Sequence, residues 1–184
     1  MIWHETDIQG VWVLDVDRKE DNRGFFARIF CVNEFKEHGI EYPTTQCNAT
    51  YNRVKGTIRG MHYQLPPNAE AKYVRCVRGA ILDVVVDLRP GSPTYLRHVS
   101  VELTAENRRA IYIPRLFAHG YQTLADDTEV HYQNDNFYAP ALARGIRFDD
   151  PKLGIRWPLP VTEVSRQDLN WVPFTTPEAG VQRA

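Results

Sequence analysis

The stretch KYVRCVRGAILDVVVDL, residues 72–88, decides the fold class of this chain. Valine, isoleucine, leucine and tyrosine are frequent on both sides of Gly79, and such runs are typical of strands. A glycine between two strand-forming runs predicts a hairpin at that point. Comparable runs recur at residues 11–16, 25–30, 45–51, 57–64, 95–103, 110–113, 117–124 and 129–133. The sequence therefore predicts a protein built mainly from short strands.

The segments between these runs predict turns. NRG at 22–24, PPN at 66–68 and RPGSP at 89–93 suit turns better than crossover helices, so the strands should pair mainly antiparallel. Only residues 32–38 have a helical pattern, with Asn33 as the expected N-cap, and a short turn is expected around Pro151. We predict an all-β fold, a double-stranded β-helix jelly roll with minor short helices, which can enclose a small-molecule cavity.

Length and composition predict one globular domain over residues 1–184. The chain has 22 basic and 23 acidic residues and a net charge of -1, which excludes the basic stripe of a nucleic-acid-binding protein. Cys31, Cys47 and Cys76 are far apart and are expected to be reduced thiols. Polar residues interrupt the first ten positions, and no apolar run is long enough to cross a bilayer. We therefore expect a cytoplasmic protein with no membrane or nucleic-acid partner.

The segment GTIRGMHYQ, residues 56–64, places a guanidinium and an imidazole in one strand. Strict alternation would point Arg59 and His62 to opposite faces of the sheet. Both can reach one pocket only if the strand is distorted, and Gly60 between them can bend it or form a bulge. The alternative is a surface arginine beside a hydrogen-bonded core histidine.

Other polar residues in the strands have little meaning when taken singly. Asp83 and Asp87 share a face with aliphatic residues, where a carboxylate bonds a neighbouring loop more often than it lines a cavity, so both stay unassigned. His119 and Tyr132, each taken alone, would more often be packed residues with a satisfied polar tip.

Taken together, the motifs resemble those of the dTDP-4-dehydrorhamnose 3,5-epimerase family, which belongs to the cupin group of jelly rolls. The resemblance spans about nine-tenths of the chain and runs in the same order along it. The segments that carry it are DNRGFF (21–26), GTIRGMHYQ (56–64), KYVRCVRG (72–79), DVVVDLR (83–89), SPT (92–94), IPRLFAHGY (113–121), DDP (149–151), IRWP (155–158) and SRQD (165–168).

The resemblance implies a catalytic set and a reaction. His62 is implied as the base, Tyr132 as the acid on the opposite face, Asp168 as the group that orients His62, and Lys72 as the stabiliser of an oxyanion. A proton beside a ketone is acidified by enolate formation, so a base of near-neutral pKa suffices when the oxyanion is stabilised. The implied activity is epimerisation at C3, C5 or both of a nucleotide-diphospho-4-keto-6-deoxyhexose, most simply dTDP-4-dehydro-6-deoxyglucose. Neither a metal nor a redox cofactor is implied.

The resemblance also implies a binding surface and a homodimer. An N-terminal segment would cross to the neighbouring subunit and bring Arg23 with Phe25 or Phe26 to the nucleotide base. The other implied substrate contacts are Arg28, Gln46, Asn48, Arg59, His119 and Tyr138, with Arg59 and His119 near the sugar and the diphosphate. Guanidinium groups suit a diphosphate, whose oxygens match the arginine fork.

Three departures from the family pattern affect the expected pocket. Arg28 stands where a glutamate usually contacts the base, so the nucleotide could be dTDP, CDP or GDP. The usual motif Pro-x-Gly-Phe-Ala-His-Gly-Phe has Leu116 in place of its glycine and ends in Tyr121 in place of phenylalanine. An acidic residue that often follows the Tyr-x-Pro turn is replaced in ALA, residues 141–143. These features favour a divergent branch and leave the number of inverted centres open.

Two other classes of function compete with this interpretation. A metal-dependent cupin isomerase or oxygenase would need a second histidine two positions after His62, where the chain has Gln64, which leaves His62, Glu70 and His119 as an incomplete ligand set. A catalytically silent sugar-nucleotide binder is the other alternative. The retained His62, Tyr132 and Asp168 argue against it.

Overall fold

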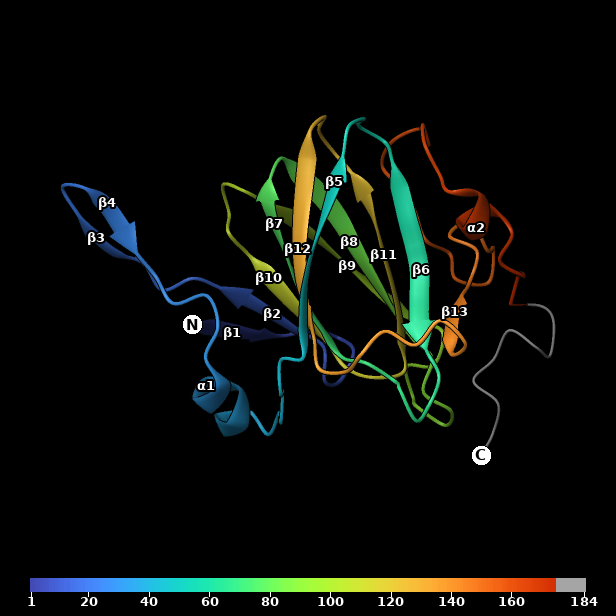
Figure 1. Cartoon of the computed structure of the whole chain (residues 1–184), viewed down its shortest axis with the longest axis horizontal. Helices are drawn as coiled ribbons and strands as arrows, with labels where there is room; N and C mark the ends of the chain where they lie inside the picture. Colours follow the sequence, from blue (N-terminus) through green and yellow to red (C-terminus); the bar gives the residue numbers. More distant parts are fainter. Residues whose placement is uncertain (175–184) are drawn as a thin grey trace.

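Two antiparallel sheets lie face to face in the computed structural model, which describes residues 1–174 (Figure 1). The six-stranded sheet has the order β1 (Ile2–Glu5), β2 (Trp12–Asp15), β10 (Ala110–Ile113), β7 (Lys72–Arg78), β12 (Thr128–Asn134) and β5 (Gln46–Asn52). The five-stranded sheet has the order β13 (Ala143–Gly145), β6 (Ile58–Gln64), β11 (Phe117–Thr123), β8 (Ala80–Asp87) and β9 (His98–Thr104). The predicted jelly roll of short antiparallel strands is confirmed.

Apolar side chains fill the space between the sheets and cover the outer face of each. Val74 of β7 and Val130 of β12 meet Ile81 of β8 and Phe117 of β11 in the central core. On the outside of the six-stranded sheet, Phe35 of α1 (Val32–Glu37) belongs to a second buried cluster. A third cluster lies on the five-stranded sheet and includes Met61, Val84, Ala118, Ile146 and Leu153. Burial on both faces explains the long apolar runs of the central strands.

The hairpin expected at Gly79 is wrong. β7 pairs with β10 and β12, whereas β8 pairs with β9 and β11, so the chain passes from one sheet to the other at Gly79. Gly79 has a φ of +74°, and a Cβ there would lie 2.4 Å from Thr128 Oγ1. The same glycine signal therefore marks a crossing between layers, because the choice of partner strand depends on contacts distant in sequence.

Two local predictions near the N-terminus also need correction. The N-cap lies two residues earlier than expected: it is Cys31 instead of Asn33, and no side chain caps the helix. The run 25–30 forms a strand only in β4 (Gly24–Phe26), which pairs with β3 (Lys19–Asp21) in a separate hairpin. Beyond it, the carbonyl of Ile29 accepts hydrogen bonds from the side chains of Tyr73 and Arg75 and takes no part in a strand ladder.

The strands β1, β3 and β13 and the short helix α2 (Arg166–Leu169) were not expected from the sequence. Ser165 caps α2, with its hydroxyl oxygen accepting from the Asp168 amide at 3.0 Å. The expected turn around Pro151 is present, with Leu153 N donating to Asp150 O. All three cysteines are free thiols. Within residues 1–174, no helix has both the length and the apolar character needed to span a bilayer.

Candidate active site

A cavity of about 490 Å³ lies between the two sheets, at the polar end of the same space that holds the central core. The change from core to cavity can be followed along single strands. Val130 of β12 is buried in the core, whereas Tyr132 and Asn134 on the same face line the cavity. On β7, Val74 packs in the core and Lys72 lines the cavity. A volume of this size is typical of small-molecule sites.

The opposite wall depends on an irregularity in β6 at Gly60. The ladder between β6 and β11 pairs His62 with His119 and Arg59 with Tyr121, so three steps on β6 face two steps on β11. One extra residue inverts the alternation, and Arg59 and His62 therefore line one cavity. A Cβ on Gly60 would lie 2.5 Å from Gly120 Cα, so the two backbones touch at the bulge. Of the two alternatives that the sequence left open, the structure has the distorted strand with both side chains in one pocket.

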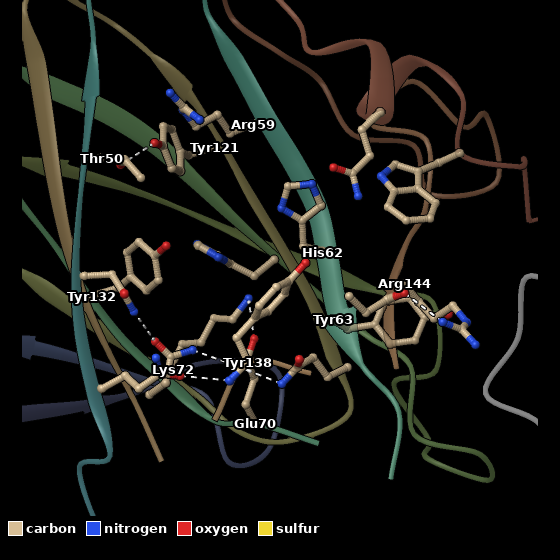
Figure 2. Close-up of a pocket in the computed structure, with 18 residues that line it drawn as sticks. Thr50, Arg59, His62, Tyr63, Glu70, Lys72, Tyr121, Tyr132, Tyr138 and Arg144 are labelled. Atoms are coloured by element: carbon tan, nitrogen blue, oxygen red, sulfur yellow. Dashed lines mark hydrogen bonds and ion pairs between the residues drawn. The ribbon is translucent and has the colours of Figure 1, made fainter. Parts of the chain in front are cut away.

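His62 projects into the cavity (Figure 2). Asp168 holds one of its ring nitrogens. The distance from His62 Nε2 to Asp168 Oδ1 is 2.5 Å, and Trp171 Nε1 donates to the same oxygen at 3.2 Å. Burial alone would raise the pKa of Asp168, but hydrogen bonds from His62, Ser165 and Trp171 outweigh it and hold the pKa below its usual value. An ionised carboxylate only accepts, so Nε2 carries the proton and neutral His62 keeps a lone pair on Nδ1.

Tyr132 faces this histidine from the other sheet. It belongs to β12 of the six-stranded sheet, while His62 belongs to β6 of the five-stranded sheet, and Figure 2 shows the two side chains on different sides of the cavity. Burial, and then the nearby negative charge of Glu70, raise the pKa of the Tyr132 phenol. The hydroxyl therefore stays protonated at neutral pH and can act as a proton donor.

Lys72 is the cation at the base of the cavity. Its ammonium lies 3.3 Å from Glu70 Oε1, and the side chain of each is about one-tenth exposed. Glu70 Oε2 also accepts from Asn134 Nδ2 at 2.7 Å and from Gln64 Nε2 at 3.2 Å. This network holds Lys72 beside a carboxylate of opposite charge.

Arg59 and His119 are each positioned by a buried polar partner. Arg59 Nε donates to Asn52 Oδ1 at 2.7 Å, and His119 Nε2 lies 2.8 Å from Asp83 Oδ2. Asp83 is fully buried, which explains the carboxylate that the sequence places among aliphatic residues. Both arrangements fix the side chain on the cavity wall, and the Arg59 guanidinium is able to bind an anion there.

Tyr138 lies at the rim of the cavity and is more than half exposed. Its backbone N–H donates to Gln46 Oε1 at 2.8 Å, and the next N–H, of Ala139, donates to Gln64 Oε1 at 2.7 Å. Two side-chain amides on β5 and β6 thus hold the loop that carries Tyr138.

Of the residues proposed from the sequence, eight line the cavity and one lies behind His62. The eight are Gln46, Asn48, Arg59, His62, Lys72, His119, Tyr132 and Tyr138, and the ninth is Asp168. Asn52, Asp83, Glu70, Tyr121 and Trp171 support or line the same site and were not assigned to it. Asp83 had a visible signal, a carboxylate in an apolar strand, and Tyr121 and Glu70 had been noted for other reasons.

The other four proposed residues lie outside this cavity. Arg23, Phe25 and Phe26 belong to the β3–β4 hairpin, which extends away from the two sheets (Figure 1). Arg23 pairs with Asp21, and Phe26 is 73% exposed. Arg28 donates to Glu34 at 3.1 Å. Within one subunit these side chains do not reach the cavity.

The ligand set considered for a metal-dependent cupin does not assemble. His62 and His119 each bond a separate carboxylate, and Glu70 bonds Lys72, Gln64 and Asn134. Among residues 1–174, no group of three or more histidine, cysteine, aspartate or glutamate side chains is placed to hold a metal ion.

Known proteins share both this sequence and this fold. Residues 5–176 match the dTDP-4-dehydrorhamnose 3,5-epimerase family. A dTDP-4-dehydrorhamnose 3,5-epimerase of Shigella flexneri is 40% identical over 171 residues, which cover 92% of this chain and 94% of that protein. A Legionella pneumophila epimerase solved with dTDP-4-keto-L-rhamnose has a TM-score of 0.90 at 32% identity, covering 100% of this chain and 99% of that one.

A 3'-monoepimerase of Streptomyces bikiniensis, solved with dTDP-quinovose, is also similar. Its TM-score is 0.88 at 36% identity, and the match covers 95% of this chain and 89% of that one. Sequence and structure therefore agree, and this chain belongs to the dTDP-4-dehydrorhamnose 3,5-epimerase family.

Proposed function

We propose that this protein is a cofactor-independent epimerase of dTDP-4-dehydro-6-deoxyglucose that inverts C3 and C5. The observation that carries the proposal is the placement of a base and an acid on opposite walls of one cavity that a buried ammonium also lines. The relatives named above act on dTDP-sugars, which supports dTDP over CDP or GDP as the nucleotide.

The reaction begins with proton abstraction beside the C4 ketone. Nδ1 of His62 takes the proton from C3 or C5, and the electron pair of the broken C–H bond forms an enolate whose charge lies on the C4 oxygen. Lys72 stabilises this oxyanion, and Asp168 stabilises the imidazolium that forms. The adjacent carbanion centre is now planar and can be protonated from either side.

Inversion follows from protonation on the opposite face. The Tyr132 hydroxyl donates its proton to the carbon, and the enolate returns to the ketone. His62 then loses its extra proton to solvent, and the Tyr132 phenolate recovers one from solvent. The abstracted and delivered protons are different, so every inversion in D₂O leaves one deuterium at the inverted carbon.

The proposed binding residues fall into those of the cavity, which would contact the sugar and the diphosphate, and those of the N-terminal segment, which would contact the nucleotide base. We assign Arg59 and His119 to the sugar and diphosphate, and Gln46, Asn48 and Tyr138 to the remaining cavity wall. We further propose that Arg23, Phe25 or Phe26, and Arg28 reach the base in a homodimer, in which the N-terminal segment of one subunit enters the cavity of the other. An exposed aromatic on a projecting hairpin supports this arrangement. The three free thiols fit the reducing cytoplasm, which we propose as the compartment.

The decisive experiment follows deuterium and configuration together. The protein is incubated in D₂O with dTDP-4-dehydro-6-deoxyglucose, and NMR measures deuterium and stereochemistry at C3 and C5. We expect both C3 and C5 to gain deuterium and invert. Deuterium at C3 alone would show that the protein is a 3-epimerase and does not act on C5. Titration of dTDP, CDP and GDP tests the base, and a preference for CDP or GDP would contradict the assignment of dTDP.

A pair of histidine variants separates catalysis from folding. His62→Ala should abolish deuterium uptake, whereas His131→Ala, which removes an exposed histidine of β12 paired with Glu129, should retain it. Retention of more than a few per cent of the exchange in His62→Ala would remove His62 from the role of base.

Mixing two inactive variants tests the exchanged dimer. If Arg23→Ala and His62→Ala are each inactive, refolding them together forms mixed dimers in which the intact cavity of one subunit receives the intact hairpin of the other. Random pairing makes about half of the dimers mixed, each with one intact site, so about a quarter of the wild-type activity should return. No recovery would contradict the exchange.

A further inference from the structure

The hydroxyl of Tyr121 is part of a buried polar chain that connects the two sheets. Tyr121 belongs to β11, is 4% exposed, and lies 2.9 Å from Thr50 Oγ1 of β5. Asn52 Nδ2, also of β5, donates to the Tyr121 oxygen at 3.3 Å. Figure 2 shows Tyr121 beside Arg59, with Thr50 opposite, at one end of the cavity. Tyr121 stands where the family motif usually has a phenylalanine, which has no such hydroxyl.

The two ends of this chain, Arg59 and Thr50, set the direction of its hydrogen bonds. An arginine can only donate, so Arg59 Nε donates to Asn52 Oδ1 at 2.7 Å. The Asn52 amide nitrogen must then face the other way, where it donates to Tyr121 Oη and to Thr128 O. Tyr121 accepts from Asn52, and because the Thr50 hydrogen points to Val130 O at 3.4 Å, the Tyr121 hydroxyl is the donor to Thr50. The Asn52 amide and the Tyr121 hydroxyl are thus the two groups of this chain that both accept and donate between side chains.

The consequence for Arg59 is a fixed orientation. Its Nε is occupied by Asn52, and Nη2 makes only a long contact of 3.4 Å with the Tyr51 carbonyl. Within the described part of the chain, Nη1 makes no hydrogen bond with another residue. Because Arg59 lines the cavity, its Nη1 and Nη2 groups can donate hydrogen bonds to a bound ligand. Two N–H donors of one guanidinium match the oxygens of a diphosphate.

We propose that Tyr121 is a positioning residue for diphosphate binding, acting through Asn52 to hold Arg59 with its Nη end toward the ligand. This inference rests on the proposed function, since it takes the ligand to be a sugar nucleotide. It assigns a role to a position at which this chain departs from the pattern of its family.

Tyr121→Phe removes the hydroxyl alone and should weaken dTDP binding by about three- to tenfold, the usual effect of losing one net hydrogen bond. Titration calorimetry measures dTDP, with thymidine, which has no phosphate, as the second probe. Thymidine affinity should be unchanged. In turnover, KM should rise while kcat stays within about twofold, because the hydroxyl does not touch the reacting carbons.

A double-mutant cycle with Arg59→Ala separates positioning from general destabilisation. In the Arg59→Ala background, Tyr121→Phe should cause no further loss of dTDP affinity, because the group that it positions is gone. Tyr42→Phe is the matched control: it removes another buried phenol hydroxyl, one that donates to the Gln133 carbonyl away from the cavity, and should leave dTDP affinity unchanged. An equal loss from Tyr121→Phe in both backgrounds would overturn the proposal.

A readout without nucleotide distinguishes this inference from the proposed function. The Arg59 Nε–H signal in NMR should exchange with water at least about tenfold faster in Tyr121→Phe than in the wild type, because its acceptor is no longer fixed. Unchanged exchange would overturn the positioning role even if dTDP binds. If instead Arg59→Ala binds dTDP as well as the wild type does, the assignment of Arg59 to the diphosphate fails, and the positioning role in ligand binding fails with it.

Discussion

Replacing Asp168 by asparagine tests how His62 is activated. Three donors point at the Asp168 carboxylate: His62 Nε2 at 2.5 Å and Trp171 Nε1 at 3.2 Å share Oδ1, and the Gly60 amide lies 3.5 Å from Oδ2. The NH₂ group of the new amide must face one side or the other. Facing Gly60 costs less free energy, because the NH₂ group then meets only the distant Gly60 N–H donor. Facing the other way, it would meet the nearer N–H donors of His62 and Trp171.

The amide oxygen should therefore stay toward His62, and the proton should remain on Nε2. The substitution then removes the negative charge but keeps the tautomer. A hydrogen bond involving an ionised group contributes about 1.5–3 kcal/mol, against about 0.5–1.5 kcal/mol for a neutral pair. The difference of about 1–1.5 kcal/mol in stabilising the imidazolium predicts a loss of about tenfold in the rate of proton abstraction.

Deuterium uptake at C3, measured by NMR at saturating substrate, gives this rate directly. His62→Ala serves as the lower limit, because loss of a general base costs about a hundred- to ten-thousandfold. The dTDP affinity of Asp168→Asn should match that of the wild type. The reasoning is refuted if Asp168→Asn is as inactive as His62→Ala while still binding dTDP, or if its rate is unchanged.

Two further predictions concern a proton donor and a buried carboxylate. Tyr132→Phe should keep deuterium exchange while inversion falls by about a hundredfold or more, since His62 can still remove and return a proton on one face; a parallel fall of both would assign the acid to another group. Burial alone would raise the pKa of Asp87, but hydrogen bonds from Arg89, Ser92 and Thr94 lower it to about 2 from the usual 3.8. This lowered pKa stabilises the fold above about pH 4, and the contribution, about 2 kcal/mol, is lost as pH falls toward 2. Asp87→Asn should therefore be destabilised relative to the wild type in urea unfolding at pH 7 and much less so near pH 2, and a difference independent of pH would contradict the assignment.

The sequence predicted the strands because their apolar runs are short, rich in β-branched residues and separated by turn residues. It did not predict which strands pair. Gly79 has the same local signature whether the chain folds back in one sheet or crosses to the other, and only long-range contacts decide. The strand β3 was missed because its sequence, KED, is charged and exposed, so no buried face marks it.

The site was predicted in a similar, uneven way. Gly60 between Arg59 and His62 allowed the bulge to be anticipated, since a single extra residue is the simplest way to bring both side chains to one face. Most of the catalytic set came from resemblance and not from spacing. Asn52 could not be assigned, because its role depends on the pairing of β5 with β12 and on a contact with a strand of the other sheet. Polar partners of this kind become visible only once the layers are placed.

The contact between Gly60 and Gly120 limits how this enzyme can diversify. A Cβ on Gly120 would lie 2.7 Å from the Arg59 carbonyl, and one on Gly60 would meet Gly120 itself, so a side chain at either position would force β6 and β11 apart. Substitution at Gly60 or Gly120 would therefore disturb the placement of both Arg59 and His62 at once. Natural divergence and laboratory evolution toward new sugars should instead change the opposite wall, where Gln46, Asn48 and Thr50 lie on a regular strand, so that exchanging one of them leaves the strand geometry unchanged.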